Sequence, residues 1–129
     1  MQIRAPLPSE IEPIRQFLCA NGWEHRIGSP EWFSLLVANS QRVAVAVVAG
    51  EVVGFARGIT DGLSNGYLSM VVVAPEHQRK GVGAALVRLV LGEESGITWV
   101  LRAGRPDAPE FFSKLGFNLS SAAMERQRE

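Results

Sequence analysis

The sequence is poor in cysteine, histidine and net charge, and each shortage excludes a class of protein. Its 129 residues include one cysteine and two histidines, and 13 basic side chains balance 13 acidic ones. The lone Cys19 cannot form an internal disulfide, which is typical of a reducing cytoplasm. A net charge of zero provides no overall field to recruit nucleic acid or an anionic membrane. We therefore expect a cytoplasmic protein that binds neither nucleic acid nor a membrane.

Long apolar segments and metal-ligand motifs are also lacking. The longest apolar stretch, Val43 to Val53, is interrupted by Gly50 and Glu51 and is too short to span a bilayer. The first residues contain no apolar run of the kind that signal peptides carry. No spacing of Cys, His and carboxylate residues indicates a metal site, so we expect no bound metal.

The composition is that of an ordinary globular protein. Apolar residues make up 47% and charged residues 20% of the chain, which excludes a disordered tail and, with the length, predicts one domain over residues 1–129. Periodicity and turn residues predict strands at Met1–Ala5, Arg42–Ala49, Val52–Ile59, Tyr67–Val73, Ile97–Arg102 and Phe117–Arg126, and helices at Ser9–Asn21, Ser29–Val37, Val82–Glu94 and after Asp107. This order predicts an α/β fold with a mixed, mostly antiparallel central sheet and about four flanking helices. The Gly50-Glu51 turn is expected to close a hairpin, and Ser9 with Glu12 to form a capping box.

A strand, a proline-containing turn and a helix follow one another between residues 70 and 87. A helix N-terminus has unpaired N–H groups and a partial positive charge, which together attract phosphate oxygens. Gly81 and Gly83 lack a Cβ and allow those N–H groups to approach an anion closely. Arg79 and Lys80 add positive charge beside them. The segment therefore predicts a binding site for a diphosphate.

Two other glycine-rich phosphate loops do not match this segment. A dinucleotide-binding loop needs a third glycine where Leu86 stands, and no suitable acidic residue lies downstream. A nucleoside-triphosphate loop needs Gly-Lys-Ser/Thr at its end, which is absent. A strand–turn–helix without any ligand is the remaining structural alternative.

Three segments resemble the GNAT acyl-CoA-dependent acetyltransferases. Gln78–Gly83 is similar to their loop pattern Gln/Arg-x-x-Gly-x-Gly/Ala, and Ala108–Phe117 resembles their second motif, Ala-x-x-Phe-Tyr-x-Lys-x-Gly-Phe. Val53–Arg57, followed by Thr60–Gly62 and Tyr67–Leu68, is similar to a branch of small bacterial members. The likeness runs from about Trp32 to Phe117, and on these motifs the chain is identified as a member of the family.

The resemblance implies the GNAT fold, with a splay between two strands where the thioester arm lies, and acetyl-CoA as co-substrate. It implies that the main chain of the strand before the loop binds the pantetheine arm and that the loop binds the diphosphate. The implied cofactor-binding residues are Val71, Val72, Val73, Gln78, Arg79, Lys80, Gly81, Val82, Gly83, Ala84 and Phe112. The implied reaction is transfer of an acetyl group to a primary amine by direct attack in a ternary complex.

Three polar positions of the family pattern are altered. Phe112 stands where many members have the tyrosine that protonates the leaving thiolate, Arg105 falls near a frequent asparagine, and Met70 takes a position that is often acidic. The general acid and base are therefore unnamed. Tyr67 is the candidate catalytic residue, with Ser69 on the same strand face, and a packed tyrosine is the alternative. The same departures favour a second hypothesis, a regulatory or partner-binding module that binds acyl-CoA without turnover.

The acceptor is expected to be an amine, most simply a small molecule; a small amine, an amino-acid derivative, an antibiotic and a protein N-terminus all fit. Trp23, His25 and Trp32 fall in the segment that walls the acceptor site in the family, so they form either an aromatic pocket or part of the core. Carboxylates at Glu24, Glu31 and Asp61 could gather there, although Asp61 also fits a turn. His77 is expected to be a solvated turn residue. A homodimer is one open possibility.

Overall fold

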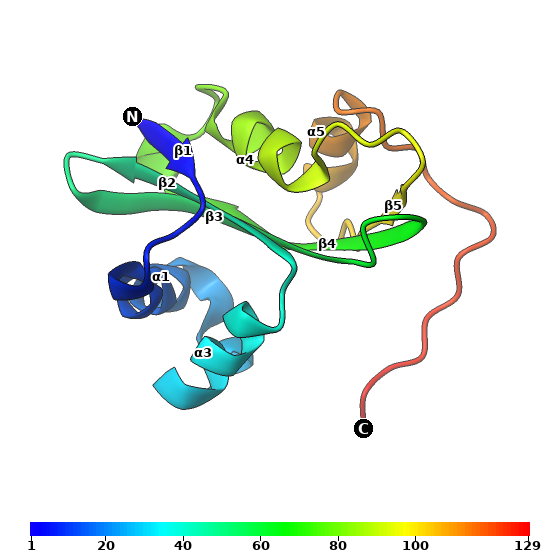
Figure 1. The fold of residues 1–129 in the computed structure, drawn as a ribbon. Coiled ribbons are helices and arrows are strands. Elements are labelled where there is room, and N and C mark those ends of the chain that lie inside the picture. The colour runs from blue at the N-terminus through cyan, green and yellow to red at the C-terminus, as the bar shows by residue number, and fades with distance from the viewer.

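A five-stranded sheet with the order β1-β2-β3-β4-β5 organises the computed structural model, which describes residues 1–129 (Figure 1). The strands are β1 (Gln2–Arg4), β2 (Arg42–Val48), β3 (Glu51–Thr60), β4 (Asn65–Val73) and β5 (Thr98–Val100). The pairs β1–β2, β2–β3 and β3–β4 are antiparallel, and the pair β4–β5 is parallel. The mixed, mostly antiparallel sheet predicted from the sequence is therefore confirmed.

Helices cover both faces of the sheet (Figure 1). They are α1 (Ile11–Leu18), α2 (Glu24–Ile27), α3 (Pro30–Ala38), α4 (Val82–Leu91) and α5 (Ala108–Ser113), with short 3₁₀ turns at Pro8–Glu10 and Pro75–His77. The segment Cys19–Trp23 joins α1 to α2 through a kink, because Asn21 and Gly22 leave the helical conformation. In Figure 1, α1 and α3 lie on one side of the sheet, and α4 and α5 on the other. No helix is long and apolar enough to cross a membrane.

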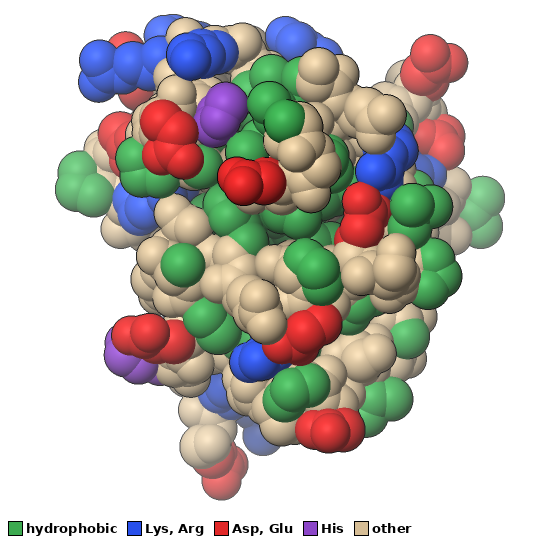
Figure 2. Space-filling model, turned by 90° about the vertical axis from the view of Figure 1, so that its left-hand side faces the viewer, with side chains coloured by type: hydrophobic (Ala, Val, Ile, Leu, Met, Phe, Trp, Pro, Cys, Tyr) green, Lys and Arg blue, Asp and Glu red, His purple; other side chains and the backbone are tan.

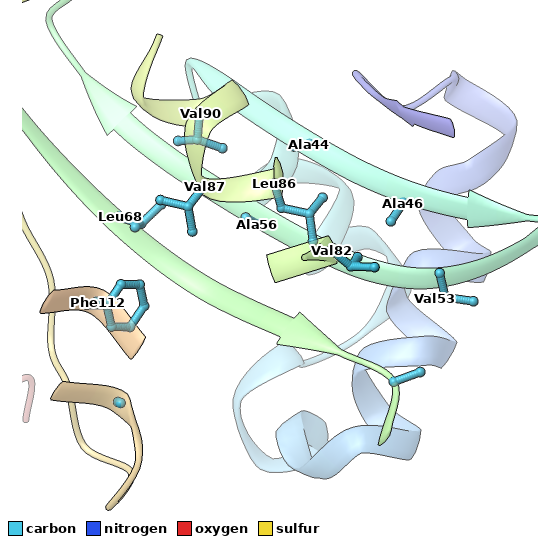
Figure 3. Packing of buried hydrophobic residues seen from close by; sticks show 12 residues of the cluster. Ala44, Ala46, Val53, Ala56, Leu68, Val82, Leu86, Val87, Val90 and Phe112 are labelled. Atoms are coloured by element: carbon cyan, nitrogen blue, oxygen red, sulfur yellow. The ribbon is translucent and has the colours of Figure 1, made fainter. Parts of the chain in front are cut away.

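Helix α4 forms the centre of one core layer (Figure 3). Its buried positions Leu86 and Val90 are four residues apart and so lie on one helix face, which packs on the sheet. The sheet presents Ala44, Ala46 and Ala56 to this face, all fully buried. Such short side chains allow the helix to approach the strands closely, which brings the loop before α4 up to the end of β4.

The opposite face carries a second core cluster, where α1 and α3 pack. Phe33 of α3 and Phe55 of β3 are fully buried with ring centroids 6.2 Å apart. Ile14 and Leu18 of α1 complete the cluster from one side. These contacts hold the α1–α3 segment beside the middle of β3 and β4.

The starts of the first helices show one serine cap and one wrong prediction. Ser29 caps α3, since its Oγ accepts a hydrogen bond from the Trp32 N–H at 3.1 Å. Ser9 does not cap α1, because the chain first makes a 3₁₀ turn in which Glu10 accepts from the Leu7 N–H at 2.7 Å. Glu12 instead pairs with Arg15.

Several predicted boundaries move for local reasons. The β2–β3 turn is made by Ala49 and Gly50, both at positive φ, rather than by Gly50 and Glu51. Helix α4 ends at Leu91 rather than Glu94, because Gly92 at φ +67° leaves the helix. The strand predicted over Ile97–Arg102 is shorter, covering Thr98–Val100.

The strand predicted over Phe117–Arg126 is wrong. No residue after α5 is in a strand, and the C-terminal segment runs along one end of the molecule as irregular chain (Figure 1). Leu119 and Met124 are almost fully exposed, so this segment has no apolar face that would hold it against the sheet. One ion pair, Arg102 Nε to Glu125 Oε2 at 2.6 Å, connects it to the segment after β5.

We expect Gly66→Ala to destabilise the fold by about 1–3 kcal/mol, the usual cost of overpacking. Gly66 pairs with Trp99 across the β4–β5 ladder, and a Cβ at this position would lie 2.5 Å from the indole ring. Gly104→Ala is the matched control, because its Cβ would meet no atom within 4 Å. Chemical denaturation measures both variants, and equal stabilities would contradict the role of this contact.

Candidate functional site

Strands β4 and β5 pair over three residues only and then separate. The ladder joins Asn65 to Thr98, Gly66 to Trp99 and Tyr67 to Val100, and no pair follows. Beyond these positions β4 continues to Val73 without a neighbour on that side. We call this separation the splay, and it lies at the carboxyl ends of the two strands.

A β-bulge shapes β4 beside the splay. The β3–β4 register changes between Phe55↔Val72 and Arg57↔Ser69, so two residues of β4 oppose a single residue of β3. Met70 lies in the bulge with φ +55°, a conformation uncommon for a residue with a side chain. Its side chain is buried in the α1–α3 core cluster, so this position supplies neither an acid nor a base.

Side chains rather than a strand satisfy two β4 carbonyl groups. Arg105 Nη2 donates to the Val71 carbonyl oxygen at 3.2 Å, and Gln78 Nε2 donates to the Val73 carbonyl oxygen at 3.0 Å. Both donors come from segments outside the sheet. These two carbonyls therefore lie on an edge of β4 where an extended ligand with amide groups can pair.

The predicted phosphate loop makes a tight turn before α4. Arg79 and Gly81 have φ values of +63° and +83°, and Gly81 is the N-cap of α4. The first helical hydrogen bond of α4 runs from the Ala85 N–H to the Gly81 carbonyl, so the preceding N–H groups of the first turn have no helical partner. Arg79 and Lys80 are exposed. Figure 2 shows basic side chains gathered at the top of its face, at the height of this loop in Figure 1.

Gly83 has a second role that the sequence did not reveal. A Cβ on Gly83 would lie 3.0 Å from the Phe111 ring and 3.6 Å from Val73 Cγ2. Because Gly83 has no side chain, α5 can pack against the loop, and the main chain of the loop is also exposed.

A cavity of about 940 Å³ opens at the splay. Its lining includes Asn21, Gly22, Trp23, His25, Arg26, Trp32, Leu36, Arg57, Ile59, Tyr67, Leu68, Ser69, Met70, Val71, Leu101, Arg102, Gly104, Arg105, Ala108, Phe112 and Arg128. The volume lies in the range of small-molecule sites. Side chains from both faces of the sheet contribute, because the splay leaves an opening between β4 and the segment after β5.

The cavity unites some of the predicted site residues and leaves others outside. Tyr67, Val71 and Phe112 all line it, whereas the loop from Gln78 to Ala84 lies outside its wall and Val72 is buried in the α1–α3 core cluster. Phe112 is 7% exposed and packs edge-on against Phe111, with ring centroids 4.8 Å apart. It offers no hydrogen-bond donor to the cavity.

The aromatic residues that were predicted to form either a pocket or core line the cavity. Trp23, His25 and Trp32 all contribute to its wall, and Trp32, in the first turn of α3, is 47% exposed. Trp23 also packs against the α1–α3 core cluster. His77 lies outside the cavity, in the turn before the loop. No group of three or more His, Cys, Asp or Glu side chains is placed to hold a metal ion.

The expected carboxylates do not reach the cavity. Glu24, Glu31 and Asp61 are all absent from its lining. Asp61 has the turn role that was predicted, since its Oδ1 accepts three main-chain N–H groups at 2.7–3.1 Å. These hydrogen bonds lower the pKa of Asp61.

Arg57 is the functional candidate that sequence reasoning missed. It lies in the nearly continuous apolar run of β3, is 7% exposed and lines the cavity. Burial lowers the pKa of this guanidinium, while the neighbouring Tyr67 acts in the opposite direction. One cation inside an apolar strand was the signal that could have identified it.

Comparisons with known proteins agree with this architecture. The family model for the acetyltransferase (GNAT) domain matches residues 39–119. A comparison with curated protein sequences found no match.

Solved structures with the same fold come from several bacteria. A protein of Xanthomonas campestris pv. campestris assigned to the GNAT family is 23% identical, with a TM-score of 0.79 over 99% of this chain and 94% of that one. An acetyltransferase assigned in Deinococcus radiodurans R1 is 23% identical, with a TM-score of 0.77 over 98% and 87%. The ribosomal-protein-alanine N-acetyltransferase of Brucella melitensis biovar Abortus is 16% identical, with a TM-score of 0.75 over 98% of each chain.

At these identities the solved structures show the fold alone. The family model, in contrast, covers more than half of the chain and includes β2 to β5, the loop before α4, and α5. Its span contains the splay and the predicted phosphate loop. The chain belongs to the GNAT acetyltransferase family.

Proposed function

We propose that residues 1–129 act as one N-acetyltransferase domain that transfers the acetyl group of acetyl-CoA to a primary amine. The observation that carries this proposal is the position of two free-edge carbonyls of β4. They lie between the N-terminus of α4 at one end and a cavity of about 940 Å³ at the other. Membership of the family supports acyltransferase activity in general, and this geometry supports a thioester donor with an extended arm.

The α4 N-terminus fits the diphosphate of the donor. Main-chain N–H groups from Arg79 to Ala84 would hold its oxygens, with positive charge from Arg79 and Lys80 at the rim. The pantetheine arm would pair with the main chain of Val71 to Val73. For this pairing the arm competes with the hydrogen bonds from Arg105 to the Val71 carbonyl at 3.2 Å and from Gln78 to the Val73 carbonyl at 3.0 Å.

The reaction is direct attack on the thioester. The neutral amine nitrogen attacks the carbonyl carbon, the C–N bond forms, and the C–S bond breaks. The amine loses its proton to water, and the departing thiolate takes a proton from water or from a hydroxyl group. Holding both substrates in line at the splay supplies much of the reduction in the barrier.

No acid at the Phe112 position assists the thiolate. A thiol titrates near pH 8.5, so its thiolate is a fairly good leaving group without an acid. Tyr67 is the candidate hydroxyl, since it lines the same cavity as Phe112. The apolar Phe112 and Met70 favour one alternative, a module that binds acyl-CoA without turnover. Release of CoA thiol across a panel of amines distinguishes the two functions, because binding without release would favour the module.

We expect wild-type protein to bind acetyl-CoA in calorimetric titration and Ala84→Asp to bind at least tenfold more weakly. A carboxylate in the first turn of α4 suits the helix, because it complements the partial positive charge of the N-terminus. The same carboxylate would repel a diphosphate at that site. Failure of the wild type to bind at millimolar acetyl-CoA would overturn the cofactor assignment.

Ala84→Asn is the matched control, because it has nearly the same size as Ala84→Asp without the charge. A smaller loss for Asn than for Asp is expected if charge repulsion is the cause. Equal affinity of Ala84→Asp and wild type would contradict diphosphate binding at this turn. Thermal unfolding of both variants checks that α4 remains intact.

We expect Phe112→Tyr to leave acetyl-CoA affinity roughly intact and to raise turnover, because a positioned acid contributes about 10²–10⁴-fold. The gain is smaller where amine attack limits the rate. Phe111→Tyr is the matched control, since Phe111 is the adjacent ring and lies outside the cavity lining. Steady-state CoA release measures both. An equal effect of the two changes would contradict an acid position at Phe112.

Tyr67→Phe tests the candidate proton source. Reduced turnover with unchanged acetyl-CoA affinity is expected if the Tyr67 hydroxyl protonates the thiolate. Unchanged turnover would remove Tyr67 from the mechanism and leave water as the proton source.

A further inference from the structure

The splay cavity is lined by five arginines and no carboxylate. They are Arg26, Arg57, Arg102, Arg105 and Arg128. They come from α2, β3, the segment after β5 and the C-terminal chain. Because the whole chain has a net charge of zero, this concentration of positive charge is a local property of the cavity.

Most of these arginines already have a partner in the protein. Arg102 pairs with Glu125 at 2.6 Å, Arg105 donates to the Val71 carbonyl oxygen, and Arg26 lies over the Trp23 ring, 5.9 Å from its centroid. Arg128 is exposed in the C-terminal chain, where water can solvate its guanidinium group.

Arg57 differs because it is buried without a counterion. It is 7% exposed and makes one hydrogen bond, from Nε to Ser40 Oγ at 3.0 Å. Its two terminal nitrogens have no hydrogen-bond partner in the protein, and neither nitrogen is fully buried. They therefore remain accessible from the cavity that Arg57 lines. A buried charge is costly unless it is paired, so this fork of donors is suited to an anion that enters from solvent.

The register places this fork beside the β4 residues at the splay. Arg57 lies directly opposite Ser69, and Ile59 lies opposite Tyr67. Directly opposed residues of an antiparallel pair share a face, so all four side chains line the same wall. An anion held by Arg57 would therefore lie within the acceptor part of the cavity.

We propose that the acceptor is an amine that also carries a carboxylate and an apolar group, such as an amino acid with a hydrophobic side chain, and that Arg57 binds the carboxylate. This assignment rests on the proposed acetyltransferase function. A planar guanidinium matches a carboxylate through two parallel hydrogen bonds. Trp23, Trp32 and Leu36 provide the apolar wall for the remainder of the acceptor.

The same positive charge helps the amine to react. Nearby cations disfavour protonation of an amine and so lower its pKa. A larger fraction of the acceptor is then neutral and nucleophilic near pH 7, which lessens the need for a dedicated base. This agrees with a cavity wall that has no Asp or Glu.

The experiment compares L-phenylalanine with phenethylamine, which lacks the carboxylate, and with L-phenylalaninamide, in which the carboxylate is a neutral amide. We expect kcat/KM for CoA release to be about tenfold or more higher for phenylalanine, because a site with buried polar donors rejects an analogue that leaves them unpaired. The proposal is overturned if kcat/KM for phenethylamine or for the amide equals that for phenylalanine. Preference for O-phosphoethanolamine would also overturn it, in favour of a phosphate-bearing acceptor.

Arg57→Gln assigns the preference to this residue. We expect the ratio of kcat/KM between phenylalanine and phenethylamine to fall toward one, because phenylalanine loses its carboxylate partner as well as the nearby charge, whereas phenethylamine loses the nearby charge alone. Arg88→Gln, an exposed arginine of α4 outside the cavity, is the control and should keep the wild-type ratio. If Arg57→Gln keeps the wild-type ratio, the role of Arg57 is overturned. If this variant does not fold, the comparison of the three amines with the wild-type protein still tests the proposal.

Failure of the proposed function has a different signature. It would show as no acetyl-CoA binding, or as no CoA release with any amine. Carboxylate recognition is then tested without turnover, by thermal shift with 3-phenylpropionate against 3-phenylpropan-1-ol. Stabilisation by the carboxylate alone, lost in Arg57→Gln, supports the anion site, and equal effects of the two compounds overturn it.

Discussion

The arrangement of the site depends on one restriction in the sheet, the arrest of β4–β5 pairing after three residues. Trp99 fixes this short ladder by packing on Gly66, and the strands separate immediately afterwards. Because β4 continues for several residues beyond the ladder, its main chain is left with a free edge inside the protein. The helices on both faces then enclose that edge. A fully paired sheet would have neither the cavity nor accessible carbonyls on β4.

The segment from β4 to α4 could be predicted because local signals agree there. Glycine spacing, a proline turn and a helical apolar stripe all indicate the same strand–turn–helix, and the structure contains it. The strand predicted over Phe117–Arg126 does not form, because a sequence pattern alone does not provide a neighbouring strand to pair with. The exposed side chains of that segment bury too little surface to order it against β5, which is itself only three residues long.

The proposed acceptor side of the site was less predictable than the proposed cofactor side. Phe112 could be placed by resemblance to a family motif and Tyr67 by its face of the predicted strand, and both line the cavity. Arg57 lies in a strand that is buried almost throughout, so alternation does not reveal which face it occupies. Its position opposite Ser69 depends on the register shift at the Met70 bulge. That shift is a tertiary property that strand propensity does not contain.

The close approach of Gly83 to Phe111 connects the predicted phosphate loop with the splay cavity. A side chain at position 83 would displace the Phe111 ring, and Phe111 packs edge-on against Phe112 at the cavity. Substitutions at positions 83 and 111 should therefore show strong epistasis, since a larger residue at one position requires a smaller residue at the other. We expect the volumes of these two residues to vary together among related sequences, because packing at Phe111 restricts which residues the predicted phosphate loop can carry.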